Sequence, residues 1–190
     1  MKRYFLIVAA LCWSSISFAQ NQQDKNVIDA DKLSESQLAH ISDAAPKDGW
    51  VLVKYKSEHY IMNFSNDDYI FKLSIHCKDV AQTPGYLIEY SENYGDKEMG
   101  GIDFLSSAKM DFAQVKFYLD GKNFDNPFSD TKNQNFSNFR QALKTAAILK
   151  IEVFEQEPDP EGAKEGLKLN RSIEFKVAHG TLLDTAVLCR

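Results

Sequence analysis

The chain has 190 residues and a formal net charge of −5. This charge argues against sequence-independent binding to nucleic acids, which depends on Lys and Arg neutralising phosphates, and against docking on an anionic membrane surface. At this length the simplest organisation is one globular domain with a sizeable core.

The N-terminus has the three parts of a secretory signal. Lys2 and Arg3 form a basic region, and residues 4–13 form an apolar region. Within residues 17–19, Ser17 and Ala19 supply small side chains at the two positions that a signal peptidase reads. The apolar run is shorter than the roughly 20 residues of a membrane-spanning helix. We therefore expect residues 1–19 to be a signal peptide, cleaved between Ala19 and the following glutamine, and the mature chain to be periplasmic or secreted, without a membrane span.

The region after the signal changes character twice. Residues 20–33 are polar and lack a hydrophobic period, which predicts a flexible leader. Residues 34–190 show no internal repeat and no long Pro, Gly or Ser linker, so we expect a single β-rich globular domain. A capping-box pattern at Ser34 and Gln37, followed by apolar residues at helical spacing, predicts a short helix over about 35–45.

From Trp50 the hydrophobic period changes to two residues. Aromatic and β-branched runs separated by short polar turns follow at 50–55, 59–64, 69–77 and 86–91. This pattern predicts an antiparallel meander, because antiparallel strands can be joined by short loops. Cys77 ends the third run on the same face as Ile75, which predicts that its sulfur points towards the core.

The second half of the domain is predicted to combine strands with one longer helix. The expected elements are an edge strand over 102–105, a strand within 113–122 ending at an Asp120-Gly121 turn, a helix over 136–147, strands over 148–155 and 167–177, and a short helix or turn over 181–189. We infer an α+β fold, mainly antiparallel β, in which a curved sheet or sandwich carries two or three short helices.

Removal of the signal leaves two cysteines, Cys77 and Cys189. An even pair in an exported chain most simply forms a disulfide. The chain-entropy model assigns about 4–5 kcal/mol to closing a loop of roughly 100 residues. Two alternatives stay open: a pair of buried free thiols, and a reactive Cys77 with His76 as its base. The second is disfavoured because adjacent strand residues point to opposite faces.

The chain contains none of the common catalytic or cofactor motifs. G-x-S-x-G, H-E-x-x-H, C-x-x-C and a phosphate-binding glycine loop are all missing from the sequence. The histidines show no metal-ligand spacing, so we expect no metal and no cofactor. Carboxylates at Glu98, Asp103 and Asp111, near a glycine-rich loop, leave open a hydrolase that uses a carboxylate pair.

Two features indicate a binding surface. Carboxylates occur at every second residue in a proline-stiffened stretch, at Glu155, Glu157, Asp159 and Glu161, and can meet a basic patch on a partner. Tyr86 and Tyr90 share a face of the fourth predicted strand, and exposed tyrosines are enriched at recognition surfaces. The acidic stretch can equally be a solvated loop, and the tyrosines can be half-buried sheet residues.

Export, one disulfide, a β scaffold and an acidic loop together favour a non-enzymatic binding protein. Within that class we expect an inhibitor or an immunity-type protein that neutralises another protein, for example a basic toxin or enzyme. The competing hypotheses are an envelope hydrolase with dispersed carboxylates and an envelope structural or stress protein.

Overall fold

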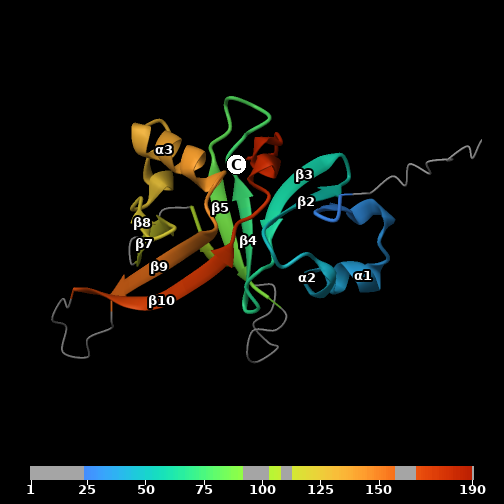
Figure 1. Cartoon of the computed structure of the whole chain (residues 1–190), viewed down its shortest axis with the longest axis horizontal. Coiled ribbons are helices and arrows are strands. Elements are labelled where there is room, and N and C mark those ends of the chain that lie inside the picture. Colours follow the sequence, from blue (N-terminus) through green and yellow to red (C-terminus); the bar gives the residue numbers. More distant parts are fainter. Residues whose placement is uncertain (1–23, 92–102, 108–112, 157–165, 190) are drawn as a thin grey trace, which may run out of the picture.

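The computed structural model describes residues 24–91, 103–107, 113–156 and 166–189 (Figure 1). Within these ranges the chain forms two β-sheets with three short α-helices. The predicted class, α+β with mainly antiparallel strands, is confirmed. The predicted signal peptide lies outside the described residues.

The first sheet has six strands in sequence order, β1 to β6. Their bounds are Val27–Asp29, Trp50–Tyr55, Glu58–Asn63, Tyr69–Ser74, Gly85–Tyr90 and Asp103–Ser106. Strands β2 to β6 pair antiparallel with their neighbours, as the meander pattern predicted. Lys56 and Ser57 join β2 to β3 with φ angles of 47° and 63°, the left-handed conformation that tight hairpin turns need.

The expected flexible leader is wrong for the part that the structure describes. β1 pairs parallel with β2, with Val27 opposite Leu52. Asn26 and Ala30 are buried on either side of the strand, and a 3₁₀ turn follows at Ala30–Lys32. This polar segment forms a strand because β2 supplies partners for its backbone hydrogen bonds. The hydrophobic pattern of the segment itself could not reveal this pairing.

The helix expected over about 35–45 is split in two. α1 covers Glu35–Ala39 and α2 covers Ile41–Ala44, with His40 in a non-helical conformation between them. The capping box of Ser34 and Gln37 is present as predicted. The helices lie beside β2 and β3 in Figure 1 and cover a second, smaller core on the outer face of the six-stranded sheet, built from Ala30, Ala45, Val51, Val53 and Phe64.

The second sheet has four strands in the order β10-β9-β7-β8. Their bounds are Leu167–Lys176 for β10, Ile148–Gln156 for β9, Ala113–Leu119 for β7 and Lys122–Asn123 for β8. Asp120 and Gly121, with φ angles of 47° and 83°, form the predicted hairpin turn between β7 and β8. The Asp120 carboxylate also accepts hydrogen bonds from the backbone of Ala147 and Ile148, so this turn fixes the start of β9.

The longest described helix, α3, covers Gln134–Leu143 and is preceded by a 3₁₀ turn at Pro127–Ser129. It begins earlier than the predicted 136–147 because the Asn133 side chain accepts from Phe136 N and caps it. It ends earlier because Ala147 donates to Asp120 instead of continuing the helix. A further 3₁₀ turn at Gly180–Asp184 corresponds to the predicted C-terminal helix or turn.

Buried side chains from both sheets form one hydrophobic core. Phe71 of β4 stacks on Phe175 of β10 with ring centroids 5.3 Å apart. Where the sheets meet, Trp50 N donates to Ala178 O at 3.0 Å, and a Cβ on Gly49 would lie 2.3 Å from that oxygen. Only glycine therefore fits at this crossing.

Candidate protein-binding surface

Apolar side chains are exposed near the far end of the β9–β10 hairpin, which projects to the lower left in Figure 1. Leu167 and Leu169 of β10 are 47% and 54% exposed. Leu169 stands in register with Phe154 of β9, which is only partly buried. These three side chains, together with Lys116 of β7, are called the arm surface below.

A register shift explains why the two leucines face outwards. Arg171 pairs with Val153 on the core side of the sheet, whereas Leu169 pairs with Phe154, which lies on the opposite side from Val153. The irregularity at Asn170 therefore changes which face the β10 side chains occupy. Beyond it, Ile173 and the residues that alternate with it return to the core.

The outer face of the four-stranded sheet also carries charge. The Lys116 ammonium lies 4.9 Å from the centre of the Phe154 ring. Lys150 pairs with Glu152 at 2.7 Å, and the hydrogen bond from Lys150 holds the pKa of the Glu152 carboxyl below its usual value. The arm surface thus combines apolar anchors with nearby charges, the composition that protein interfaces use.

The structure places only one residue of the acidic run. Glu155 is half-buried in β9, in register with Lys168 of β10 and Ala113 of β7. Glu157, Asp159 and Glu161 lie outside the described residues. Because adjacent strand residues point to opposite faces, Glu155 lies on the face of Val153 rather than on that of Phe154. The run therefore begins next to the arm surface along the chain, but from the other face of β9.

The expectation that Tyr86 and Tyr90 are exposed is wrong. Each is only 5% exposed, because the face of β5 that they share is the core face. The Tyr86 ring lies 5.1 Å from that of Phe117 and 4.9 Å from that of Phe128, and burial raises the pKa of its hydroxyl. Period-two spacing identified the shared face correctly but could not tell which of the two faces was covered.

Tyr90 belongs to a polar cluster between the sheets that sequence reasoning missed. Arg171 Nη1 donates to the Tyr90 hydroxyl at 2.6 Å and to the Tyr69 hydroxyl at 3.2 Å. Burial opposes the charge of Arg171, but the hydrogen bonds outweigh it and the pKa of the guanidinium is raised. The one signal in the sequence is an arginine at a core-facing position of an otherwise apolar alternation, next to Ile173 and Phe175.

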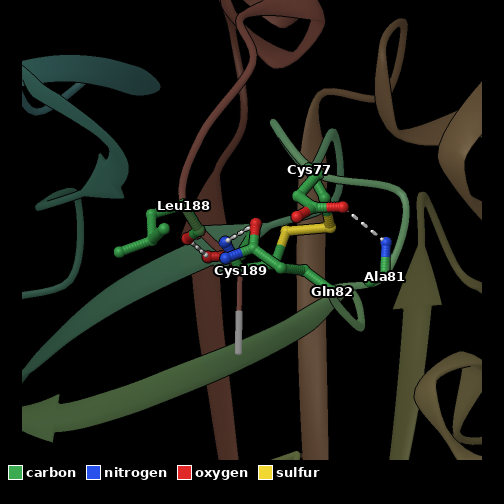
Figure 2. The surroundings of a disulfide bond; sticks show 7 residues. Cys77, Ala81, Gln82, Leu188 and Cys189 are labelled. Atoms are coloured by element: carbon green, nitrogen blue, oxygen red, sulfur yellow. Dashed lines mark hydrogen bonds between the residues drawn. A yellow bond between two sulfur atoms is a disulfide. The ribbon is translucent and has the colours of Figure 1, made fainter.

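Cys77 and Cys189 form a disulfide, with their Cα atoms 5.3 Å apart (Figure 2). The C-terminal tail lies along the residues after β4: Val187 N donates to His76 O and Lys78 N donates to Val187 O, both at 2.8 Å. The predicted pairing is therefore present in the structure. The two alternatives, free thiols and a reactive Cys77, do not fit a bonded pair.

A charged cluster joins the N-terminal part of the chain to the end of β10. Asp48 accepts from Lys25 Nζ at 2.8 Å and lies 3.3 Å from His179 Nε2. The hydrogen bond from Lys25, followed by that from His179, holds the pKa of the Asp48 carboxyl below its usual value. His179 has a φ of 64°, so its backbone turns sharply at this point.

The carboxylates on which the hydrolase hypothesis depends are not placed by the structure. Glu98 and Asp111 lie outside the described residues, and Asp103 begins β6 without a described side chain. Within the described ranges, no group of three or more His, Cys, Asp or Glu side chains is arranged to hold a metal ion. None of the helices that the structure describes is long and apolar enough to cross a membrane.

Comparison with known proteins finds no match for this chain among protein-family models, curated proteins or solved structures.

Proposed function

We propose that this chain is an exported, non-enzymatic binding protein of the inhibitor or immunity type, and that it holds its partner through the arm surface and the adjoining acidic run. The observation that carries this proposal is the exposure of Leu167 and Leu169 beside Phe154, immediately before Glu155. The partner would present a basic surface with an apolar recess.

The arm surface supplies the affinity in this proposal. Single exposed leucines are common on protein surfaces and carry no information. Here the strand register brings Leu169 opposite Phe154, and Leu167 lies on the same face of β10, so the exposure is contiguous. Burying one leucine side chain contributes about 1.5–3 kcal/mol, enough for two leucines to act as anchors.

The acidic run supplies the rate of encounter. Four carboxylates in one short segment, at Glu155, Glu157, Asp159 and Glu161, attract a basic partner over long range. Such steering weakens when salt screens the charges, whereas apolar contacts persist. The two parts of the surface can therefore be separated experimentally.

Two observations support export. The N-terminal sequence has the form of a secretory signal, and a Cys77–Cys189 disulfide is the kind of bond that persists in oxidising compartments. The same bond ties the tail to the body of the protein, which suits a rigid binding scaffold.

The test is capture of a partner by the exported form, repeated with three variants. L167D/L169D removes the apolar anchors, E157K/D159K reverses part of the acidic run, and V80D adds a charge at a fully exposed apolar residue away from the arm. We expect a stoichiometric basic partner that L167D/L169D loses and V80D retains.

Association rates with the purified partner then test steering. E157K/D159K should slow association at low salt and have little effect at high salt. Equal capture by wild type and L167D/L169D would contradict binding through the arm, and an unchanged association rate of E157K/D159K at low salt would rule out steering.

A further inference from the structure

A small pocket lies on the outer face of the six-stranded sheet, away from the four-stranded sheet that carries the arm. Its volume is about 250 Å³, just below the range of about 300–1,000 Å³ typical of drug-sized ligands. It is lined by Tyr60, Lys72, Ser74, Gly85, Tyr86, Leu87, Ser107, Leu188 and Cys189. The pocket therefore suits a ligand smaller than a typical drug molecule.

One wall of the pocket is the C-terminal tail. The disulfide holds Cys189 in place, and its backbone N–H donates to Gln82 Oε1 at 3.2 Å (Figure 2). Leu188 is directed away from the disulfide in Figure 2 and is 44% exposed. Ser74 Oγ donates to the Leu188 carbonyl oxygen at 3.4 Å, which is long for a hydrogen bond. A ligand acceptor at a shorter distance can replace this contact.

The opposite wall stays open because of a glycine. A Cβ on Gly85 would lie 2.4 Å from Ser107 Oγ, so a side chain here would displace Ser107. Without one, the Ser107 hydroxyl stands directly over β5 and lines the pocket.

The charge in the pocket comes from Lys72, the only charged side chain among the described residues that line it. Its ammonium lies 4.3 Å from the centre of the Tyr60 ring, which holds it on the outer face. Leu87 stands opposite Lys72 in the strand register, and Leu188 adds a second apolar side chain. The lining thus presents a cation, serine hydroxyls and two apolar side chains.

We propose that this pocket binds a small organic carboxylate with a short apolar body. The carboxylate interacts with Lys72 and with the hydroxyls of Ser74 and Ser107, and the apolar part contacts Leu87 and Leu188. A charge-assisted hydrogen bond favours a carboxylate over a neutral amide of the same shape. The site does not depend on the arm surface, because the two lie on different sheets.

The test is a titration of the oxidised protein, followed by amide chemical shifts, with sodium hexanoate, sodium acetate, hexanamide and hexylammonium. We expect hexanoate to bind saturably, at least roughly tenfold more tightly than hexanamide or hexylammonium, because only it pairs with the ammonium. The shifts should concentrate at β4, β5 and Leu188.

Two variants sharpen the result. K72M should weaken hexanoate binding roughly tenfold, whereas K54M, which removes an exposed lysine of β2 outside the pocket, should leave it unchanged. L188A truncates an exposed side chain outside the core, so it tests binding in the pocket independently if K72M does not fold. It should weaken hexanoate binding severalfold and leave acetate binding unchanged. Hexanamide binding as tightly as hexanoate, no saturable binding of hexanoate, or unchanged affinity in folded K72M or in L188A would overturn the proposal.

Discussion

Arg171 of β10 donates a hydrogen bond of 2.6 Å to the hydroxyl of Tyr90 on β5 and so links the two sheets. Tyr90 is buried and Arg171 is half-buried at this point. The Tyr69 ring lies 5.5 Å from the Tyr90 ring and its hydroxyl shares the same guanidinium. A cation between two phenols thus closes one side of the core.

Removing the Tyr90 hydroxyl should destabilise the protein. Y90F removes the 2.6 Å hydrogen bond that Arg171 donates to the Tyr90 hydroxyl, and a hydrogen bond to a charged group contributes about 1.5–3 kcal/mol. We expect the free energy of unfolding, measured by urea denaturation, to fall by about 1–2 kcal/mol.

Y69F is the matched control, because Tyr69 makes the longer hydrogen bond and is only half-buried. It should cost less than Y90F. In a double-mutant cycle, the Y90F/R171M variant should lose less free energy of unfolding than the sum of the losses of Y90F and R171M. Additive losses would show that Arg171 and Tyr90 do not stabilise one another.

The disulfide should contribute a large part of the stability. Cys77 and Cys189 are separated by 112 residues, and the chain-entropy model assigns about 4–5 kcal/mol to a loop of this size. The C77S/C189S variant should therefore unfold at a much lower urea concentration than the oxidised wild type. Added reductant should lower the wild-type midpoint and leave that of the variant unchanged; a variant as stable as the oxidised protein would contradict this assignment.

Asn63 should be sensitive to truncation although it is polar. Its side chain is fully buried, donates to Lys176 O at 2.6 Å and accepts from Ser65 N at 2.9 Å. N63A leaves Ser65 N without its acceptor and Lys176 O with only the long contact from Ser65 Oγ, and it should cost about 2–3 kcal/mol. N138A, at an exposed position of α3, is the control and should change stability by less than about 0.5 kcal/mol. Equal effects would mean that Asn63 does not hold β10 to β3.

Much of the fold could be predicted because local signals and tertiary contacts agree. Alternation of apolar residues predicted the strands from Trp50 onwards, Asp120-Gly121 predicted a hairpin turn, and Ser34 with Gln37 predicted a helix start, as the structure confirms. The Cys77–Cys189 pairing was predicted from the expected export of the chain and from the two cysteines that lie outside the expected signal peptide.

The features of the fold and of the candidate site that the sequence did not predict depend on contacts between segments that are distant in the sequence. β1 forms because β2 offers its edge, which no property of residues 27–29 reveals. The burial of Tyr86 and Tyr90 depends on which face the second sheet covers. The exposure of Leu167 and Leu169 depends on the register shift before Arg171, and alternation alone would have placed them on the core side.

The charged cluster at Asp48 should make stability depend on acid pH. The pKa of this carboxyl is lowered in the folded protein, chiefly by Lys25, so its contribution is complete above the unfolded value of 3.8 and is lost as the pH falls through the folded value. D48N should therefore differ from wild type at neutral pH, by less than about 1 kcal/mol because the site is partly exposed.

This difference should disappear at the lowest pH at which the protein still folds. The free energy of unfolding of wild type and of D48N is measured across the same pH range. Parallel profiles down to acid pH would contradict the role given to Asp48.

The most direct measurement is the intact mass of the protein recovered from the exported fraction of cells that express the full sequence, alkylated without reductant. The proposed function predicts a chain that begins after Ala19 and carries no label on Cys77 or Cys189. A cytosolic chain that retains residues 1–19 and takes up label at both cysteines would contradict export and the disulfide together.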